Sequence, residues 1–159
     1  MKLTPTIAHQ IALDYAPQIK PQRQGDFFLI HTTNVVKIAK IIAKKLNLDE
    51  DFFEIIGRIH DIGYVKNMEH AEYSLSILTD LWYEIDPKLK DCILNHGNAK
   101  TPTTLEGKIF QIADKLSIFD AGIIELFLEH EDFPMTKDGL EFLKAMSEKS
   151  FTLLEDFNQ

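Results

Sequence analysis

Glu54-Ile55-Ile56-Gly57-Arg58-Ile59-His60-Asp61-Ile62-Gly63-Tyr64 is the stretch that decides the fold of this chain. Its apolar residues follow helical spacing and Gly63 is a plausible helix stop, so the stretch predicts a helix that ends at His60-Asp61. Neighbours on a helix point about 100° apart, so this imidazole and this carboxylate cannot share the centre of one apolar stripe. A buried carboxylate is costly unless it is paired or bound to a cation. A metal ion would satisfy both side chains together.

Two further candidate ligands lie on either side of this pair in the sequence. His31 shares a helix face with apolar residues at i+4, i+7 and i+11, so its imidazole is expected to face inward. Asp114 has Phe110 at i-4 and Ile118 at i+4. Ligands from three helices would then meet inside a bundle, a common place for metal sites in helical proteins. The mixed imidazole and carboxylate set favours divalent iron, manganese, nickel or zinc, with magnesium also compatible, over calcium.

The order of these residues resembles the HD superfamily of metal-dependent phosphohydrolases, over roughly residues 27–120. His31 opens a long helix, His60-Asp61 closes the next, and Asp114 lies in an Ala-Asp-Lys segment like the last motif of the family. Between them, His70 and His96 resemble the two extra histidines of binuclear members. The resemblance implies an all-α fold, a compact HD-domain bundle of about six to seven helices that forms a single domain over residues 1–159.

The resemblance also implies a ligand set and a chemistry. One or two divalent ions would be bound by His31, His60, Asp61, Asp114, His70 and His96. Asp61 would bridge two ions and act in catalysis with His70 and His96. The expected activity is hydrolysis of a phosphomonoester, phosphodiester or phosphoanhydride of a nucleotide-like small molecule by metal-activated water. Lys66 and Lys115 are candidates for binding the substrate phosphate, although each is also explained as a solvated surface lysine.

Other interpretations of the same residues stay open. An HD-type di-iron oxygenase uses the same six ligands, and a non-catalytic module could bind metal or nucleotide for regulation. His31 or His96 alone is explained as a hydrogen-bonded core histidine, and Asp114 alone as a helix carboxylate paired with a lysine. His96 is followed by Gly97, and no Gly-Tyr-Pro run occurs. The cyclic-dinucleotide phosphodiesterases of the superfamily carry both features, so that activity is not expected.

Composition narrows the setting. With 159 residues, 45% of them hydrophobic, the chain is long enough for one well-filled domain. A net charge of -8 and the lack of a Lys/Arg-rich run argue against a duplex nucleic-acid partner. The single Cys92 excludes an internal disulfide and suits a reducing compartment. No signal peptide or membrane-spanning stretch is visible, so we expect a soluble, cytoplasmic protein without a membrane partner.

Apolar periodicity and helix breakers predict a helical chain without a convincing pair of strands. The expected helices lie at residues 4–15, 28–46, 49–62, 70–83, 87–97, 105–130 and 137–156. Residues 16–25 hold two prolines and a terminal glycine and are expected to form an ordered loop. The last helix has more apolar surface than it can leave in solvent. It is expected to pack on the motif-bearing core, about residues 27–120, or to form a contact in a homodimer.

Overall fold

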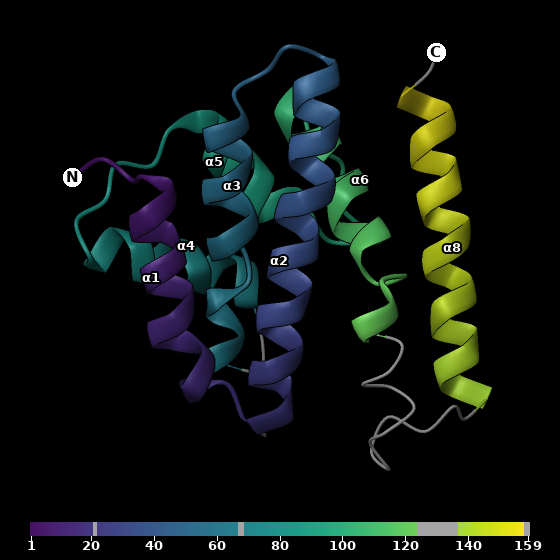
Figure 1. The fold of residues 1–159 in the computed structure, drawn as a ribbon, viewed down its shortest axis with the longest axis horizontal. Coiled ribbons are helices and arrows are strands. Elements are labelled where there is room, and N and C mark those ends of the chain that lie inside the picture. Colours follow the sequence, from purple (N-terminus) through teal and green to yellow (C-terminus); the bar gives the residue numbers. More distant parts are fainter. Residues whose placement is uncertain (21, 67–68, 124–136, 158–159) are drawn as a thin grey trace.

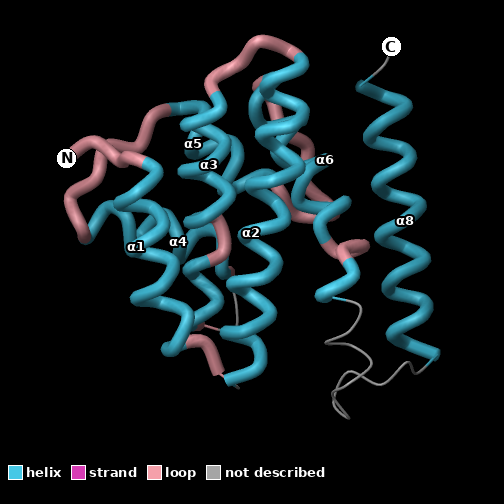
Figure 2. The backbone as a smooth tube through the Cα atoms, viewed as in Figure 1, coloured by secondary structure: helices cyan, strands magenta, loops and turns pink. Residues whose placement is uncertain are grey.

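The computed structural model describes residues 1–20, 22–66, 69–123 and 137–157, and within these ranges the chain is helical without a strand (Figure 2). This confirms the predicted all-α class. In chain order the elements are α1 (Pro5–Tyr15), the 3-10 turn η1 (Ala16–Gln18), α2 (Gln22–Lys45), α3 (Glu50–Ile59), the 3-10 turn η2 (Ile62–Val65), α4 (His70–Asp80), α5 (Pro87–Asn95), α6 (Leu105–Ser117) and α8 (Lys137–Phe157).

Four of these helices begin where a short polar side chain caps the first turn. The side chains of Thr4, Asp49, Asp86 and Thr104 accept hydrogen bonds from backbone N–H groups at the starts of α1, α3, α5 and α6. Such caps satisfy amides that have no partner within the helix. In α5 the residue after the cap is Pro87, whose ring suits the first helical position. The predicted starts of α3, α5 and α6 are therefore confirmed to within one residue.

The core lies among the first helices of the chain. Helix α2 packs against α3 and α6, α1 packs against α3, and α5 packs against α6 (Figure 1). Phe53, Ile56, Ile59 and Phe110 are completely buried between them. In the part of the chain that is described, no helix combines the length and the apolarity needed to cross a bilayer. The apolar face of α3, which ends at His60, thus becomes the centre of the bundle.

Helix α8 lies at the edge of the molecule and packs on α6 (Figure 1). Its Met146 is buried against Ile118 and Ile123, and Phe27 and Ile30 of α2 pack on the same group. These five residues form a second, smaller apolar cluster beside the main core. The packing of α8 on the domain agrees with one of the two expectations for the last helix, and its role in a homodimer stays a prediction.

The expectation for residues 16–25 is wrong over most of its length. Residues 16–18 form η1 and α2 already begins at Gln22. Gly25 was interpreted as the end of a loop, but it lies inside the helix, where a Cβ atom would come within 2.5 Å of the carbonyl oxygen of Ala16. The glycine therefore permits a close approach between η1 and α2 and does not end a loop.

The helix predicted for residues 105–130 ends much earlier. Helix α6 stops at Ser117, and the amide of Asp120 donates to the carbonyl of Ser117 in the turn that follows. The side chain of Asp120 then accepts a hydrogen bond from the amide of Gly122. This local hydrogen bond offers the backbone an alternative to continuing α6. Residues 124–130 of the prediction, and the expected helix end at Pro134, lie outside the described residues.

Candidate metal centre

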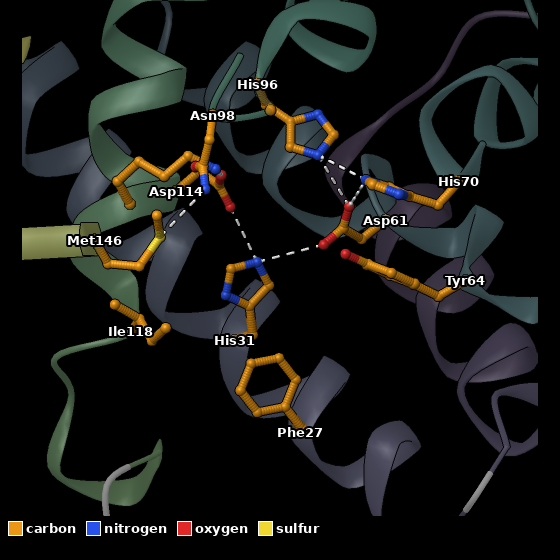
Figure 3. Close-up of a pocket in the computed structure, with 12 residues that line it drawn as sticks. Phe27, His31, Asp61, Tyr64, His70, His96, Asn98, Asp114, Ile118 and Met146 are labelled. Atoms are coloured by element: carbon orange, nitrogen blue, oxygen red, sulfur yellow. Dashed lines mark hydrogen bonds and ion pairs between the residues drawn. The ribbon is translucent and has the colours of Figure 1, made fainter. Parts of the chain in front are cut away.

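All six predicted metal ligands converge on one point of the bundle, and five helices position them. His31 projects from α2 and Asp114 from α6. His60 and Asp61 follow the last turn of α3, His70 is the first residue of α4, and His96 follows α5. Figure 3 shows the side chains of five of them turned towards one another: His31, Asp61, His70, His96 and Asp114. All of them are buried except His70, which is partly exposed.

Four of these residues form the first set of ligands. The Nε2 atoms of His31 and His60 lie 3.3 Å apart. Asp114 Oδ1 is 3.1 Å from His31 Nε2, and Asp61 Oδ2 is 3.2 Å from His60 Nε2. Ligand atoms around an ion at about 2.1 Å lie about 3.0 to 3.4 Å apart along octahedral or tetrahedral edges. The spacing of this set fits a single divalent ion.

The second set uses the other oxygen of the same carboxylate. Asp61 Oδ1 is 3.2 Å from His96 Nε2 and 3.4 Å from His70 Nε2, and these two Nε2 atoms are 3.1 Å apart. Asp61 therefore offers one oxygen to each set. A carboxylate in this position is suited to bridge two neighbouring ions.

Hydrogen bonds on the outer side of each ring decide which nitrogen is free. The Nδ1 atoms of His60 and His96 lie 3.2 and 2.7 Å from the carbonyl oxygens of Gly57 and Ile93. A carbonyl can only accept, so each Nδ1 carries a hydrogen and Nε2 of a neutral ring keeps its lone pair. Metal-binding histidines usually have such an outer partner, which fixes the ring orientation.

For His31 the outer partner is Ser117. The Ser117 hydroxyl donates its hydrogen to the carbonyl of Asp114 at 2.7 Å. Its oxygen must then accept from His31 Nδ1, which lies 2.9 Å away. When both rings are neutral, the Nε2 lone pairs of His31 and His60 therefore face each other. Two facing lone pairs repel each other unless a proton or a metal ion lies between them.

Electrostatics lead to the same conclusion. Burial by itself lowers the pKa of His60, but the Asp61 and Asp114 carboxylates outweigh it and raise the pKa to about 10. Burial raises the pKa of Asp61, yet the positive charge of His60 and nearby imidazoles hold it well below its usual range. Asp61 Oδ1 is buried without a hydrogen-bond partner in the described part of the chain. The centre thus attracts cations, and its donor atoms fit divalent metal.

Ser74 and Gly63 join the two sets of ligands. The Ser74 hydroxyl accepts from the amide of Gly63 at 2.9 Å and lies 2.7 Å from the carbonyl of His60. Gly63 was predicted to stop α3, but that helix has already ended at Ile59 and Gly63 does not have a positive φ angle. A Cβ atom there would lie 1.9 Å from the carbonyl oxygen of His70. The glycine lets α4 approach the turn after α3 and so places His70.

Gln111 has a structural role that the sequence did not reveal. Its side-chain amide donates to the carbonyl oxygens of Asn95, Gly97 and Lys100, at 3.0 to 3.1 Å. These bonds hold the loop after α5, and that loop begins with His96. In the sequence, Gln111 is visible only as part of the last motif. A single glutamine does not indicate which distant carbonyl groups its side chain will contact.

A pocket of about 290 Å³ opens over the metal centre. Its lining includes Tyr64 and Phe27, which sequence reasoning did not select. The Tyr64 ring stacks on His70 with centroids 4.2 Å apart, and Phe27 stacks on His31 at 5.6 Å. The Asp61 carboxylate and burial raise the pKa of Tyr64, so its hydroxyl keeps its hydrogen. Phe27 precedes His31 by four positions, and this helical spacing was a usable signal.

The two candidate phosphate-binding lysines have different positions. Lys115 lines the pocket, and its Nζ lies 2.5 Å from Asp114 Oδ2. Lys66 is exposed and its ammonium lies over the ring of Tyr73, 3.9 Å from the centroid. Lys66 is not among the residues that line the pocket. Lys115 therefore lies at the pocket and Lys66 does not line it, and a substrate contact stays a prediction for both.

A profile of the HD domain matches residues 28–118, a span that contains all six of the clustered ligands. The chain belongs to the HD domain family. This confirms the resemblance to the HD superfamily that was inferred from the sequence. The matched span runs from the helix of His31 to the end of α6.

Several proteins are similar to this member of the HD domain family. It is 32% identical, over 151 residues, to a deoxyguanosinetriphosphate triphosphohydrolase-like protein of Caldanaerobacter subterraneus subsp. tengcongensis, which covers 77% of this chain and 44% of the relative. A protein of the same description from Clostridium tetani is 30% identical over 178 residues, covering 91% and 50%. A ribonuclease Y of Ureaplasma parvum serovar 3 is 31% identical over 97 residues, covering 58% and 20%.

The chain spans about half the length, or less, of these curated relatives. A crystal structure of a predicted HD superfamily hydrolase from an uncultured Thermotogales bacterium superposes with a TM-score of 0.61 at 23% identity. The superposition covers 94% of this chain and 88% of that one. At this identity the likeness establishes the fold, which is that of an HD domain.

Proposed function

We propose that this chain is a metal-dependent phosphohydrolase that acts on a phosphate ester or anhydride of a nucleotide-like small molecule. The observation that carries the proposal is the double set of inward-facing Nε2 atoms around the two oxygens of Asp61. The triphosphohydrolase-like names of the first two relatives support a phosphorylated nucleotide as the class of substrate.

Two divalent ions would be held by the residues of the two sets. The first ion would be bound by His31, His60, Asp61 and Asp114, and the second by Asp61, His70 and His96. When bound, such ions lower the pKa of a water ligand and polarise a phosphoryl oxygen. Iron, manganese, nickel or zinc suits these donors best, with magnesium as a weaker candidate.

The chain's own residues orient the reaction. Asp61 would help to hold both ions, because its carboxylate offers one oxygen to each set of ligands. His70 and Tyr64 line the open side of the centre. The Lys115 ammonium lies beside Asp114 Oδ2, next to the ligand set, where it can donate a charge-assisted hydrogen bond to a phosphoryl group.

The first experiment measures metal content and phosphate release together. The protein is purified without chelator, its metals are quantified per chain, and it is assayed on a panel of nucleotides and phosphodiesters. Asp61→Ala is expected to lose metal and turnover, because it removes a ligand from both sets. Asp80→Ala changes an exposed aspartate at the end of α4 and is expected to retain both properties.

Three results would count against the proposal. If the unmodified protein contains no bound metal, the proposed metal centre is contradicted. A ferrous protein that consumes oxygen with a substrate would favour the di-iron oxygenase, which shares the ligand set. Bound metal without turnover of any phosphate compound or oxygen would favour a regulatory module that binds metal or nucleotide.

A further inference from the structure

The four histidines of the candidate metal centre are not all held in the same way. The Nδ1 atoms of His60 and His96 lie against backbone carbonyls, and that of His31 lies against the Ser117 hydroxyl. Within the described part of the chain, Nδ1 of His70 has no hydrogen-bond partner. Metal-binding histidines usually have such an outer partner, which fixes the orientation of the ring. The orientation of His70 must therefore come from another contact.

The Tyr64 ring supplies that contact. It lies nearly parallel to the His70 imidazole, with an interplanar angle of 7° and ring centroids 4.2 Å apart. This is a stacked pair, in which the tyrosine covers one face of the imidazole. The His70 side chain is 29% exposed, so without the tyrosine its ring could turn towards solvent. Stacking on Tyr64 takes the place of the outer hydrogen bond that the other three rings have.

The backbone ties Tyr64 to the ligands on both sides of it. Tyr64 lies in η2, which packs on α4, and His70 is the first residue of α4. The amide of Tyr64 donates to the carbonyl of Asp61, with a distance of 3.0 Å between nitrogen and oxygen. The tyrosine is therefore fixed relative to the carboxylate that the two ligand sets share.

The far end of the Tyr64 side chain is polar. Figure 3 shows the hydroxyl at the end of the ring that points towards the Asp61 carboxylate. Tyr64 lines the pocket over the metal centre, and no described residue forms a hydrogen bond with its hydroxyl. A tyrosine hydroxyl carries its hydrogen at neutral pH. This hydrogen is thus available to an oxygen of a group bound in the pocket.

We propose that Tyr64 positions His70 through its ring and binds the substrate through its hydroxyl, which donates a hydrogen bond to a phosphoryl oxygen. The role of the ring needs only the metal centre, whereas the role of the hydroxyl rests on the proposed function. The hydroxyl keeps its hydrogen throughout, so Tyr64 is a binding and positioning residue and does not transfer a proton. One side chain thereby links the second ligand set to the substrate.

Two variants separate the ring from the hydroxyl. Tyr64→Phe removes only the hydroxyl, and Tyr64→Leu removes the ring as well. The full chain is titrated with Mn²⁺ against a competing chelator. We expect Tyr64→Leu to bind the weaker of two ions about 3- to 10-fold less tightly, because the stacked pair is lost. Tyr64→Phe keeps that pair and is expected to bind both ions as the unmodified protein does.

The hydroxyl is tested by titrating the Mn²⁺-loaded protein with inorganic phosphate in a calorimeter. Tyr64→Phe is expected to bind inorganic phosphate about 10- to 100-fold less tightly, because it loses a donor to a charged group. For any phosphate compound that the unmodified protein hydrolyses, kcat/KM is expected to fall by a similar factor.

Tyr83→Phe is the matched control. Tyr83 is a partly buried tyrosine that packs on the main core and does not line the pocket. The control loses the same hydroxyl and is expected to retain its affinity for Mn²⁺ and for inorganic phosphate. Tyr64 is 41% exposed, so its replacement removes little of the core, and thermal unfolding checks that each variant is folded.

The outcomes separate this inference from the function on which part of it rests. Unchanged affinity of Tyr64→Leu for both ions would overturn the role of the ring. Unchanged affinity of Tyr64→Phe for inorganic phosphate would overturn the role of the hydroxyl. If no phosphate compound is hydrolysed but Tyr64→Phe still binds inorganic phosphate less tightly, the hydrolase is contradicted and Tyr64 keeps both contacts.

Discussion

At the scale of single residues, the candidate metal centre depends on the hydrogen atoms carried by its imidazoles. His60 and His96 direct their Nδ1 hydrogens to backbone carbonyls, which no side-chain substitution removes. His31 depends instead on the hydroxyl of Ser117. Among these three rings, only His31 has an outer hydrogen-bond partner, the Ser117 hydroxyl, that a single substitution can remove.

Ser117→Ala is therefore expected to weaken metal binding while every ligand is retained. Loss of an outer-shell partner of a metal-binding histidine typically lowers affinity about 10- to 100-fold, and we expect the lower part of this range because the ring stays packed against Phe27. The measurement is a metal titration with a competing chelator. Ser150→Ala is the control, because Ser150 is also buried and bonds a helix carbonyl in α8. Equal affinities of Ser117→Ala and the unmodified protein would contradict the assigned role.

At the scale of elements, the turn after α3 and the start of α4 must lie in close contact for the second ligand set to form. Gly63 makes that contact, since a Cβ atom would lie 1.9 Å from the His70 carbonyl oxygen and 2.7 Å from the Ser74 amide nitrogen. Both neighbours are backbone atoms, so they cannot move aside without moving α4 itself.

Gly63→Ala is expected to displace His70 and to lower the metal content from two ions to one, because the first ligand set does not include α4. Metal analysis of the purified variant measures this directly. Gly97→Ala is the matched control, since a Cβ atom at Gly97 meets only the Lys100 side chain, at 3.6 Å. Two tightly bound ions in Gly63→Ala would refute the assigned role of the glycine.

A second link between elements joins α5 to the loop before α6. The Asp91 carboxylate accepts hydrogen bonds from the amides and hydroxyls of Thr103 and Thr104. Burial by itself raises the pKa of Asp91, but the hydrogen bonds from Thr104, Asn95 and Thr103 outweigh it and lower the pKa to about 2. A lowered folded-state pKa adds stability that is complete above the usual pKa near 4 and is lost as the pH falls towards 2.

Asp91→Ala is therefore expected to lower the free energy of unfolding by about 2 kcal/mol at pH 7, and by progressively less between about pH 4 and pH 2. Urea unfolding of both proteins across this range measures the difference. The difference between the two proteins removes the titration of the histidine centre, which they share. A gap that stays constant down to pH 2 would show that Asp91 does not stabilise through its charge.

The elements also show what could be predicted from the sequence and what could not. Helix caps such as Asp86-Pro87 and the spacing of His31, His60-Asp61 and Asp114 depend on local pattern, and these predictions agree with the structure. The roles predicted for Gly25 and Gly63 were wrong. Each glycine lies against the backbone of another element, and a local sequence pattern does not specify such a contact. The start of α2 at Gln22 was also missed, whereas the early end of α6 comes with a local hydrogen bond between Asp120 and Gly122 that the apolar periodicity does not reveal.

At the scale of the whole molecule, the candidate metal centre joins helices that are distant in the sequence. Its ligands come from α2, α3, α4, α5 and α6 or from the residues that follow them. Global unfolding separates these helices and destroys both ligand sets together. Metal bound at the centre is then coupled to the stability of the entire bundle, because an ion that binds only the folded state lowers its free energy.

Removal of metal is thus expected to lower the melting temperature of the whole domain. At about 100 times its dissociation constant, one ion adds about 2.7 kcal/mol, which corresponds to about 5–10 °C in a chain of this size. The measurement is thermal unfolding with chelator, and again after Mn²⁺ is restored. Asp61→Ala is expected to melt at the same temperature in both conditions. If the melting temperature of the unmodified protein is the same with and without metal, no ion binds between these five helices. An ion that gave the buried Asp61 Oδ1 a partner would stabilise the fold and raise the melting temperature.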